Sequence, residues 1–98
     1  MNIAVVGTGM IAREALTALR QVEGVEVAAI CARPHSREKA LALAREFGIA
    51  QVATDYGAML AAHEADFVYL GIVNSAHFDY ARQAIKAGWH VIVEKPFA

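Results

Sequence analysis

The sequence is poor in the features that mark disulfide-rich, membrane-spanning and nucleic-acid-binding proteins. A single cysteine among 98 residues forms no internal disulfide and no zinc cluster. Nine Lys and Arg residues against ten Asp and Glu residues give a net charge of −1, whereas nucleic-acid binding favours a strongly basic surface. The apolar runs are far shorter than the roughly 20 residues of a membrane span, and the first residues do not resemble a signal peptide. We therefore expect a cytoplasmic domain without membrane or nucleic-acid partners.

Short β-branched runs alternate along the chain with longer stretches rich in Ala and Leu. This alternation is typical of a parallel sheet whose strands are joined by helices. The predicted strands are Asn2–Val6, Val25–Cys31, Gln51–Ala53, Phe67–Ile72 and His90–Glu94. The predicted helices are Met10–Arg20, Arg37–Phe47, Tyr56–Ala62 and Ala76–Ala87. Since β–α–β units cross over right-handed, residues 1–98 are expected to form one α/β domain with a doubly wound parallel sheet.

Polar and glycine residues mark the ends of the predicted helices. Ser36, Asp55 and Ser75 each stand before a helix, where a side-chain oxygen accepts a free backbone N–H. Gly48 and Gly88 each follow a helix, where a left-handed backbone conformation is favoured.

A glycine-rich turn joins the first predicted strand to the first predicted helix, with the pattern Gly7-x-Gly9-x-x-Ala12. In the Rossmann fold the first glycine allows a tight turn, the second lets a pyrophosphate approach the backbone, and the small third residue keeps the helix near the sheet. The helix dipole and free N–H groups favour the phosphates there. The predicted cofactor-binding residues of this turn are Gly7, Thr8, Gly9, Met10, Ile11 and Ala12. The alternative is a turn that binds no ligand.

The end of the second strand separates NAD-binding from NADP-binding Rossmann domains. An acidic residue there binds the ribose hydroxyls, and an arginine accommodates a 2′-phosphate. This chain has no carboxylate between Glu26 and Glu38, but has Arg33 and Arg37, with the Ser36 hydroxyl between them. We therefore predict NADP as the preferred cofactor and NAD as the second choice. Alternatively, both arginines are solvated loop charges, or Arg33 stacks on the adenine of bound NAD.

The single cysteine and three of the four histidines are interpreted as structural. Cys31 is expected to be a small buried strand residue, without a base or metal partner nearby in the sequence. His35 and His63 are placed in loops without partners, and His90 begins a strand at the edge opposite the site. The histidines show no metal-ligand spacing, so no metal site is predicted.

Charged and polar residues follow the fourth and fifth predicted strands, at the edge where open α/β sheets bind ligands. Ile72-Val73-Asn74 comes after the fourth strand, and Glu94-Lys95-Pro96 ends the fifth. Because charges buried without partners are unfavourable, Glu94 and Lys95 face either solvent or a site.

The glycine turn, Asn74-x-x-His77, Ala87-Gly88-x-His90-Val91 and Glu94-Lys95-Pro96 together resemble the glucose–fructose oxidoreductase/inositol dehydrogenase/rhizopine-catabolism family of NAD(P)-dependent oxidoreductases. The resemblance covers the whole chain. One departure lies after the fourth strand, where the family commonly has Thr-Pro-Asn and this chain has Ile72-Val73-Asn74.

The resemblance implies hydride transfer between nicotinamide and a secondary alcohol or ketone of a sugar or polyol substrate. In that case Lys95 acts on the proton of the reacting hydroxyl, and His77 lies near the nicotinamide and is a second catalytic residue. Glu94 binds ribose hydroxyls, and Ile72 and Asn74 contact the cofactor. The alternatives are a solvated Lys95 and an exposed or capping His77.

The resemblance also implies a second, α+β domain, which these 98 residues do not contain. We therefore expect an excerpt of a longer protein that assembles as a homo-oligomer through that domain. By itself the excerpt should bind dinucleotide weakly and turn over no sugar. Two other interpretations remain, a non-catalytic NAD(P)-binding sensor of the same fold and an amino-acid-pathway reductase with two domains.

Overall fold

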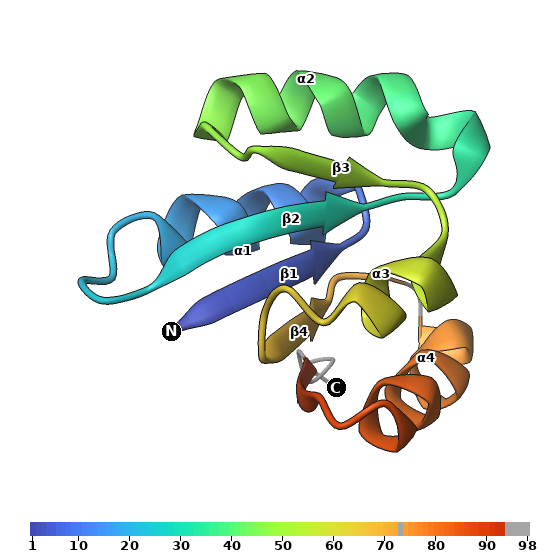
Figure 1. Cartoon of the computed structure of the whole chain (residues 1–98). Helices are drawn as coiled ribbons and strands as arrows, with labels where there is room; N and C mark the ends of the chain where they lie inside the picture. Colours follow the sequence, from blue (N-terminus) through green and yellow to red (C-terminus); the bar gives the residue numbers. More distant parts are fainter. Residues whose placement is uncertain (73, 94–98) are drawn as a thin grey trace.

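The computed structural model describes residues 1–72 and 74–93, with the backbone alone for residues 74–77. Strands and helices alternate along these residues (Figure 1). Their order is β1 (Asn2–Val6), α1 (Met10–Leu19), β2 (Glu26–Cys31), the 3₁₀ helix η1 (Pro34–Ser36), α2 (Arg37–Phe47), β3 (Gln51–Ala53), α3 (Tyr56–Ala62), β4 (Phe67–Leu70), α4 (Asn74–Lys86) and β5 (His90–Val93). Every predicted strand and helix is present, with ends that differ by at most two residues; the predicted end of the fifth strand, Glu94, lies outside the described residues. No helix among the described residues is long and apolar enough to cross a membrane.

The five strands form one parallel sheet in the order β3-β2-β1-β4-β5. The register places Val6 of β1 opposite both Cys31 of β2 and Leu70 of β4, and Leu70 opposite Val93 of β5. The carboxyl ends of these strands therefore meet at one edge of the sheet. The order of the strands reverses between β1 and β4, and such a switch point is where open α/β sheets bind ligands.

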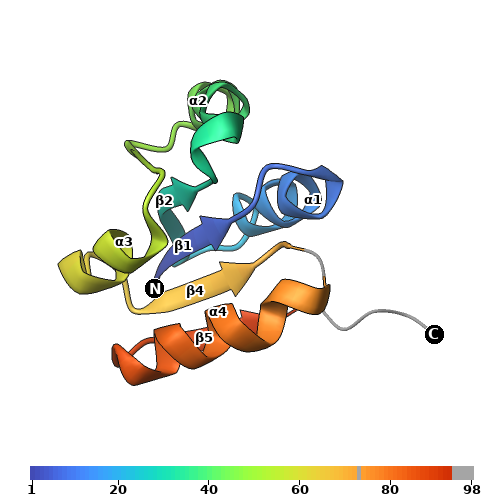
Figure 2. The ribbon, with the colours of Figure 1, turned by 90° about the vertical axis from the view of Figure 1, so that its right-hand side faces the viewer.

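Helices cover both faces of the sheet, which confirms the predicted doubly wound α/β fold. Helices α1 and α2 lie on one face, and α3 and α4 lie on the other (Figure 2). Successive residues of β1 point to opposite faces, so that Ile3 packs with α1 and α2 while Ala4 packs with α3 and α4. Because both faces are covered, residues 3–6 of β1 are all buried.

The predicted helix caps are confirmed in part. The Asp55 side chain accepts a hydrogen bond of 2.9 Å from the backbone N–H of Ala58, and Gly48 ends α2 with a φ of +69°. The prediction for Ser36 is wrong, because this residue is the last of η1 and makes no side-chain cap. The prediction for Ser75 is also wrong, because α4 begins at Asn74 and includes Ser75.

The prediction that His63 lies in a loop without partners is wrong. The residue ends α3 in a left-handed conformation with a φ of +49°. Its ring stacks on Trp89, with 5.0 Å between the ring centroids, and its Nε2 atom lies 3.9 Å from Oδ1 of Asp66. Trp89 is buried, and its indole N–H donates to the carbonyl of Leu60 at 3.1 Å. His63 is therefore part of the packing between α3 and the start of β5.

Candidate functional site

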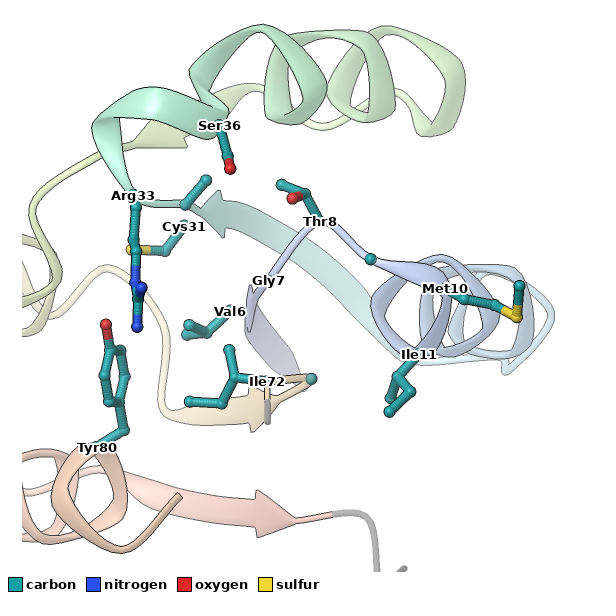
Figure 3. A pocket seen from close by; sticks show the side chains of 13 residues that line it. Val6, Gly7, Thr8, Met10, Ile11, Cys31, Arg33, Ser36, Ile72 and Tyr80 are labelled. Atoms are coloured by element: carbon teal, nitrogen blue, oxygen red, sulfur yellow. The ribbon is translucent and has the colours of Figure 1, made fainter. Parts of the chain in front are cut away.

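A cleft of about 480 Å³ opens at the carboxyl ends of β1, β2 and β4 (Figure 3). This volume lies within the usual range for small-molecule and cofactor sites. The predicted cofactor residues that line it are Gly7, Thr8, Gly9, Met10, Ile11, Arg33 and Ile72. The other lining residues are Val6, Cys31, Ala32, Ser36, Gly71 and Tyr80. The fold thus brings the glycine turn, the residues after β2 and the residues after β4 into one cavity.

Some predicted site residues lie elsewhere or are not described. Ala12 is fully buried behind the cleft rather than lining it, and Arg37 is exposed at the start of α2, outside the lining residues. Its role in cofactor binding stays a prediction. The side chains of Asn74 and His77, and the whole of Glu94 and Lys95, lie outside the described residues.

Gly7 is required by the turn itself. Its φ is +120°, which L side chains rarely adopt, and a Cβ atom at this position would collide with the carbonyl oxygen of Gly71. Its N–H donates to the carbonyl of Cys31 at 2.8 Å, and this bond fixes the turn against β2. The first glycine of the motif therefore has a structural explanation that involves no ligand.

Gly9 has no such explanation. Its φ is −80°, which any residue adopts, and a Cβ atom there would find no atom of the described residues within 4 Å. Neither backbone strain nor internal packing requires glycine at this position. The missing side chain instead leaves open space above the first turn of α1, as a ligand that approaches the backbone requires.

The electrostatics of this space favour an anion. Gly9 caps α1 without a side-chain hydrogen bond, and no acidic residue lies in the first turn. The first backbone N–H groups of a helix have no partner within the helix, and the helix dipole places partial positive charge beside them. In the described part of the chain, no acidic residue lines the cleft. A phosphate or diphosphate fits this end of α1.

Arg33 and Ser36 lie at one end of the cleft, and Ile11 lies at the other (Figure 3). Arg33 is extended, with φ −69° and ψ 155°, and Pro34 follows it at the start of η1. The N–H of Ser36 donates to the carbonyl of Arg33 at 2.9 Å, and this short turn places both side chains at the cleft. A guanidinium and a hydroxyl at this point are able to bind a second phosphate group.

Cys31 also lines the cleft, but its thiol is not a reactive group. The residue is 3% exposed, and burial, with a smaller contribution from the negative charge of Asp55, raises the pKa of its thiol to about 11. The thiol is therefore neutral at physiological pH. This agrees with the prediction of a small buried strand residue.

Tyr80 is a lining residue that no sequence motif indicates. It lies on α4, and its carbonyl accepts a 2.7 Å hydrogen bond from the hydroxyl of Tyr56 on α3. The two tyrosine rings are 4.4 Å apart between centroids. The one available signal was helical spacing, since Tyr80 lies four residues before the buried Ala84 and thus on the sheet-facing side of α4.

The described residues fit a dinucleotide. The open space at Gly9 accommodates a diphosphate, and the two ends of the cleft extend from it along the edge of the sheet. Among the residues described, no three His, Cys, Asp or Glu side chains are grouped to bind a metal ion.

The sequence and the fold are similar to known oxidoreductases. The family described as "Oxidoreductase family, NAD-binding Rossmann fold" matches residues 1–98. The chain is 36% identical over 95 residues to a D-apiose dehydrogenase from Paraburkholderia graminis, covering 97% of this chain and 25% of that protein. It is also 36% identical over 96 residues to D-xylose 1-dehydrogenase (NADP(+)) 2 from Haloferax volcanii, covering 98% of this chain and 29% of that protein.

A solved structure shows the same arrangement of elements. The 3-ketoreductase from Actinomadura kijaniata, in complex with NADP and TDP-benzene, superimposes with a TM-score of 0.87 at 33% identity. The superposition covers 98% of this chain and 29% of the ketoreductase. The chain therefore spans between a quarter and three tenths of the length of the proteins it matches here.

Proposed function

The chain belongs to this oxidoreductase family with an NAD-binding Rossmann fold, and from that premise we propose that its cleft binds NADP(H) in preference to NAD(H). We also propose that it serves hydride transfer between nicotinamide and a secondary alcohol or ketone of a sugar or polyol. One observation carries the cofactor proposal: the cleft extends from the open space at Gly9 to Arg33 and Ser36. Similarity to an NADP(+)-dependent xylose dehydrogenase and to a ketoreductase bound to NADP supports it.

Each part of the cleft has a distinct role in this proposal. The N–H groups at the start of α1 hold the diphosphate, because they are free and carry the positive end of the helix dipole. Arg33 donates to the 2′-phosphate of NADP through its planar guanidinium, and Ser36 adds a hydroxyl. Ile11 and Ile72 supply apolar surface that excludes water from the other part of the cleft.

The nicotinamide group supplies or accepts the hydride when the cofactor is bound. The proposed role of Lys95 is to hold the reacting hydroxyl or carbonyl and to give or take its proton. An ammonium does this most effectively when burial or nearby positive charge lowers its pKa. Glu94 is proposed to bind the ribose hydroxyls, and His77 to lie near the nicotinamide. These assignments rest on the family resemblance of the motifs Asn74-x-x-His77 and Glu94-Lys95-Pro96.

The cofactor proposal is tested by titrating the chain with NADP and with NAD in a calorimeter. We expect tighter binding of NADP. Arg33→Asp should weaken NADP binding roughly tenfold or more, because a charge-assisted hydrogen bond to phosphate is replaced by repulsion. The affinity of the Arg33→Asp variant for NAD should stay unchanged or rise. Arg45→Asp makes the same change of charge on the exposed end of α2, away from the cleft, and should leave both affinities unchanged.

Two results would overturn the cofactor proposal. Equal loss of NADP and NAD affinity in Arg33→Asp would show that Arg33 does not distinguish the 2′-phosphate. Absence of binding of either dinucleotide at millimolar concentration would remove the cleft as a cofactor site.

The catalytic proposal has its own test: in the active enzyme, Lys95→Met should abolish turnover of a sugar or polyol while NADP affinity is retained. Retained turnover would exclude Lys95 as the group that handles the proton.

A further inference from the structure

We propose that Tyr80 binds the adenine base of the dinucleotide through its phenol ring. This inference rests on the proposed function, since it needs a dinucleotide in the cleft. It adds a residue from α4, which is remote in sequence from the glycine turn and from the residues after β2. A flat aromatic ring offers a surface on which any base packs.

The position of Tyr80 is the first argument. Tyr80 and Arg33 line the same cleft, and their side chains point toward one another at the end opposite Ile11 (Figure 3). Arg33 follows β2, where the adenosine half of the cofactor binds in a Rossmann domain. The ring of Tyr80 is therefore at the adenosine end of the cleft. It is partly exposed there, so part of its surface remains available to a ligand.

The rigidity of Tyr80 is the second argument. The Tyr56 ring packs beside the Tyr80 ring, with 4.4 Å between centroids, and the Tyr56 hydroxyl donates to the Tyr80 carbonyl at 2.7 Å. These contacts fix both the backbone and the ring of Tyr80 against α3. A ring that is already fixed loses little conformational entropy when a base packs against it, which favours binding.

The chemistry of this end of the cleft is the third argument. In the described part of the chain, the polar side chains that line the cleft are those of Thr8 in the glycine turn and of Arg33 and Ser36 after β2, together with the phenol tip of Tyr80 and the neutral thiol of Cys31. The proposed role of Arg33 and Ser36 is to bind phosphate, and this role leaves the base without a partner. The ring of Tyr80 supplies the apolar surface that the base requires.

Ligands that contain only part of the dinucleotide separate the base from the phosphates. Binding of 5′-AMP, 2′,5′-ADP, NADP and nicotinamide mononucleotide is measured by NMR titration of the folded chain. Tyr80→Ala should weaken 5′-AMP, 2′,5′-ADP and NADP by a similar factor of at least about five. Binding of nicotinamide mononucleotide, which has no adenine, should not change. Tyr80→Phe keeps the ring and should stay within about twofold of the wild-type affinities.

Matched variants guard against an indirect effect. Phe78→Ala removes an aromatic ring from the same helix at a position that is 77% exposed and outside the cleft, and it should change no affinity. Tyr56→Phe removes the hydrogen bond to the Tyr80 carbonyl without altering a lining residue. It should retain 5′-AMP binding within about twofold, because the ring–ring contact is preserved. The ring protons of Tyr80 should also shift when wild-type protein binds 5′-AMP.

Three outcomes would overturn the proposal for Tyr80. They are unchanged 5′-AMP binding in Tyr80→Ala, an equal loss for nicotinamide mononucleotide, and a loss in Tyr80→Phe as large as in Tyr80→Ala. Failure of the cleft as a dinucleotide site looks different, because wild-type protein would then bind neither NADP nor NAD. Binding of NADP by wild-type protein together with unchanged 5′-AMP binding in Tyr80→Ala removes only the role of Tyr80.

Discussion

Gly71 lies directly against Ala12. A Cβ atom at position 71 would lie 3.2 Å from the Cα atom and 3.3 Å from the Cβ atom of Ala12. Ala12 is the third residue of the glycine motif, and Gly71 follows β4, so the contact joins the start of α1 to the neighbouring strand. The small residues at both positions allow α1 to approach the sheet closely. The cleft depends on this approach because Met10 and Ile11, in the first turn of α1, line it.

Gly71→Ala should therefore destabilise the domain by about 1–3 kcal/mol, the usual range for an added methyl group in a tightly packed region. The new Cβ atom would meet backbone atoms of Ala12, which cannot move without displacing α1. Urea unfolding measures the change. Gly57→Ala is the matched control, because a Cβ atom there makes only an ordinary contact of 3.6 Å with Asp55 and alanine favours the helix. An unaltered unfolding free energy for Gly71→Ala would contradict the packing argument.

The fold was predictable from the sequence because strand and helix patterns differ in period, but the caps were predictable only in part. Asp55 and Ser36 both precede a helix, yet only Asp55 has an extended backbone, with φ −126° and ψ 106°, from which its side chain reaches the helix. Ser36 has φ −107° and ψ 12° because it completes η1, a short helix that the sequence pattern does not predict. Local composition marks the region of a helix start, whereas backbone conformation decides which residue caps it.

The site was predictable to a similar degree. Residues of the glycine turn and Arg33 could be assigned because a local motif determines their position at the strand ends. Tyr80 could not, because its place in the cleft depends on how α4 is positioned over the sheet, through packing with Tyr56 of another helix. Arg37 is near Arg33 in sequence but is not among the residues that line the cleft, so its role in cofactor binding stays a prediction. Tertiary packing supplies the information that spacing along the chain lacks.

A bidentate ion pair joins the two helices on one face of the sheet, and it should make stability depend on pH. The Arg13 guanidinium donates to both carboxylate oxygens of Glu46, at 2.8 and 2.7 Å. This hydrogen bonding lowers the pKa of Glu46 below its usual 4.5. A carboxylate with a lowered pKa stabilises the folded state above its unfolded pKa, and the contribution is lost as pH falls through the folded pKa.

The urea midpoint should accordingly fall between pH 6 and pH 3, and part of this fall should be absent in Glu46→Gln. The effect should be modest because both side chains are about half exposed and salt screens the pair. Glu14→Gln removes an exposed carboxylate from α1 outside this ion pair and should leave the pH dependence as in wild-type protein. An identical pH dependence in Glu46→Gln and wild-type protein would show that the pair does not contribute.

The Cys31 thiol should react slowly in the folded protein. Its pKa of about 11, against 9.0 for a free thiol, reduces the thiolate fraction at pH 7.5 roughly 100-fold, and burial restricts access further. The rate of labelling by an aromatic disulfide reagent should rise with pH up to about pH 11, and saturating NADP should slow it because Cys31 lines the cleft. The chain unfolded in urea is the reference, and its single cysteine makes the signal unambiguous. Equal labelling rates in folded and unfolded protein at pH 7.5 would contradict this.

Alanine should destabilise the fold less at Gly9 than at Gly7, which separates the ligand's requirement from that of the fold. Gly9→Ala places a Cβ atom in open space at an ordinary φ, so the free energy of unfolding should fall by no more than about 1 kcal/mol, the difference between glycine and alanine as helix caps. Gly7→Ala combines a φ of +120° with a collision against the Gly71 carbonyl, and should destabilise by about 2 kcal/mol or more.

Gly9→Ala should affect ligand binding more than it affects stability. The added methyl group would occupy the space above the first turn of α1 that a diphosphate needs, so Gly9→Ala should weaken NADP, NAD and inorganic pyrophosphate together by tenfold or more while the protein remains folded. Calorimetric titration and urea unfolding of the same sample measure both effects. Gly57→Ala, on α3 and outside the cleft, should leave binding unchanged. If Gly9→Ala retained wild-type affinity for the dinucleotides, the phosphates would have to bind away from the start of α1, because an added Cβ atom at position 9 has no atom of the described residues within 4 Å.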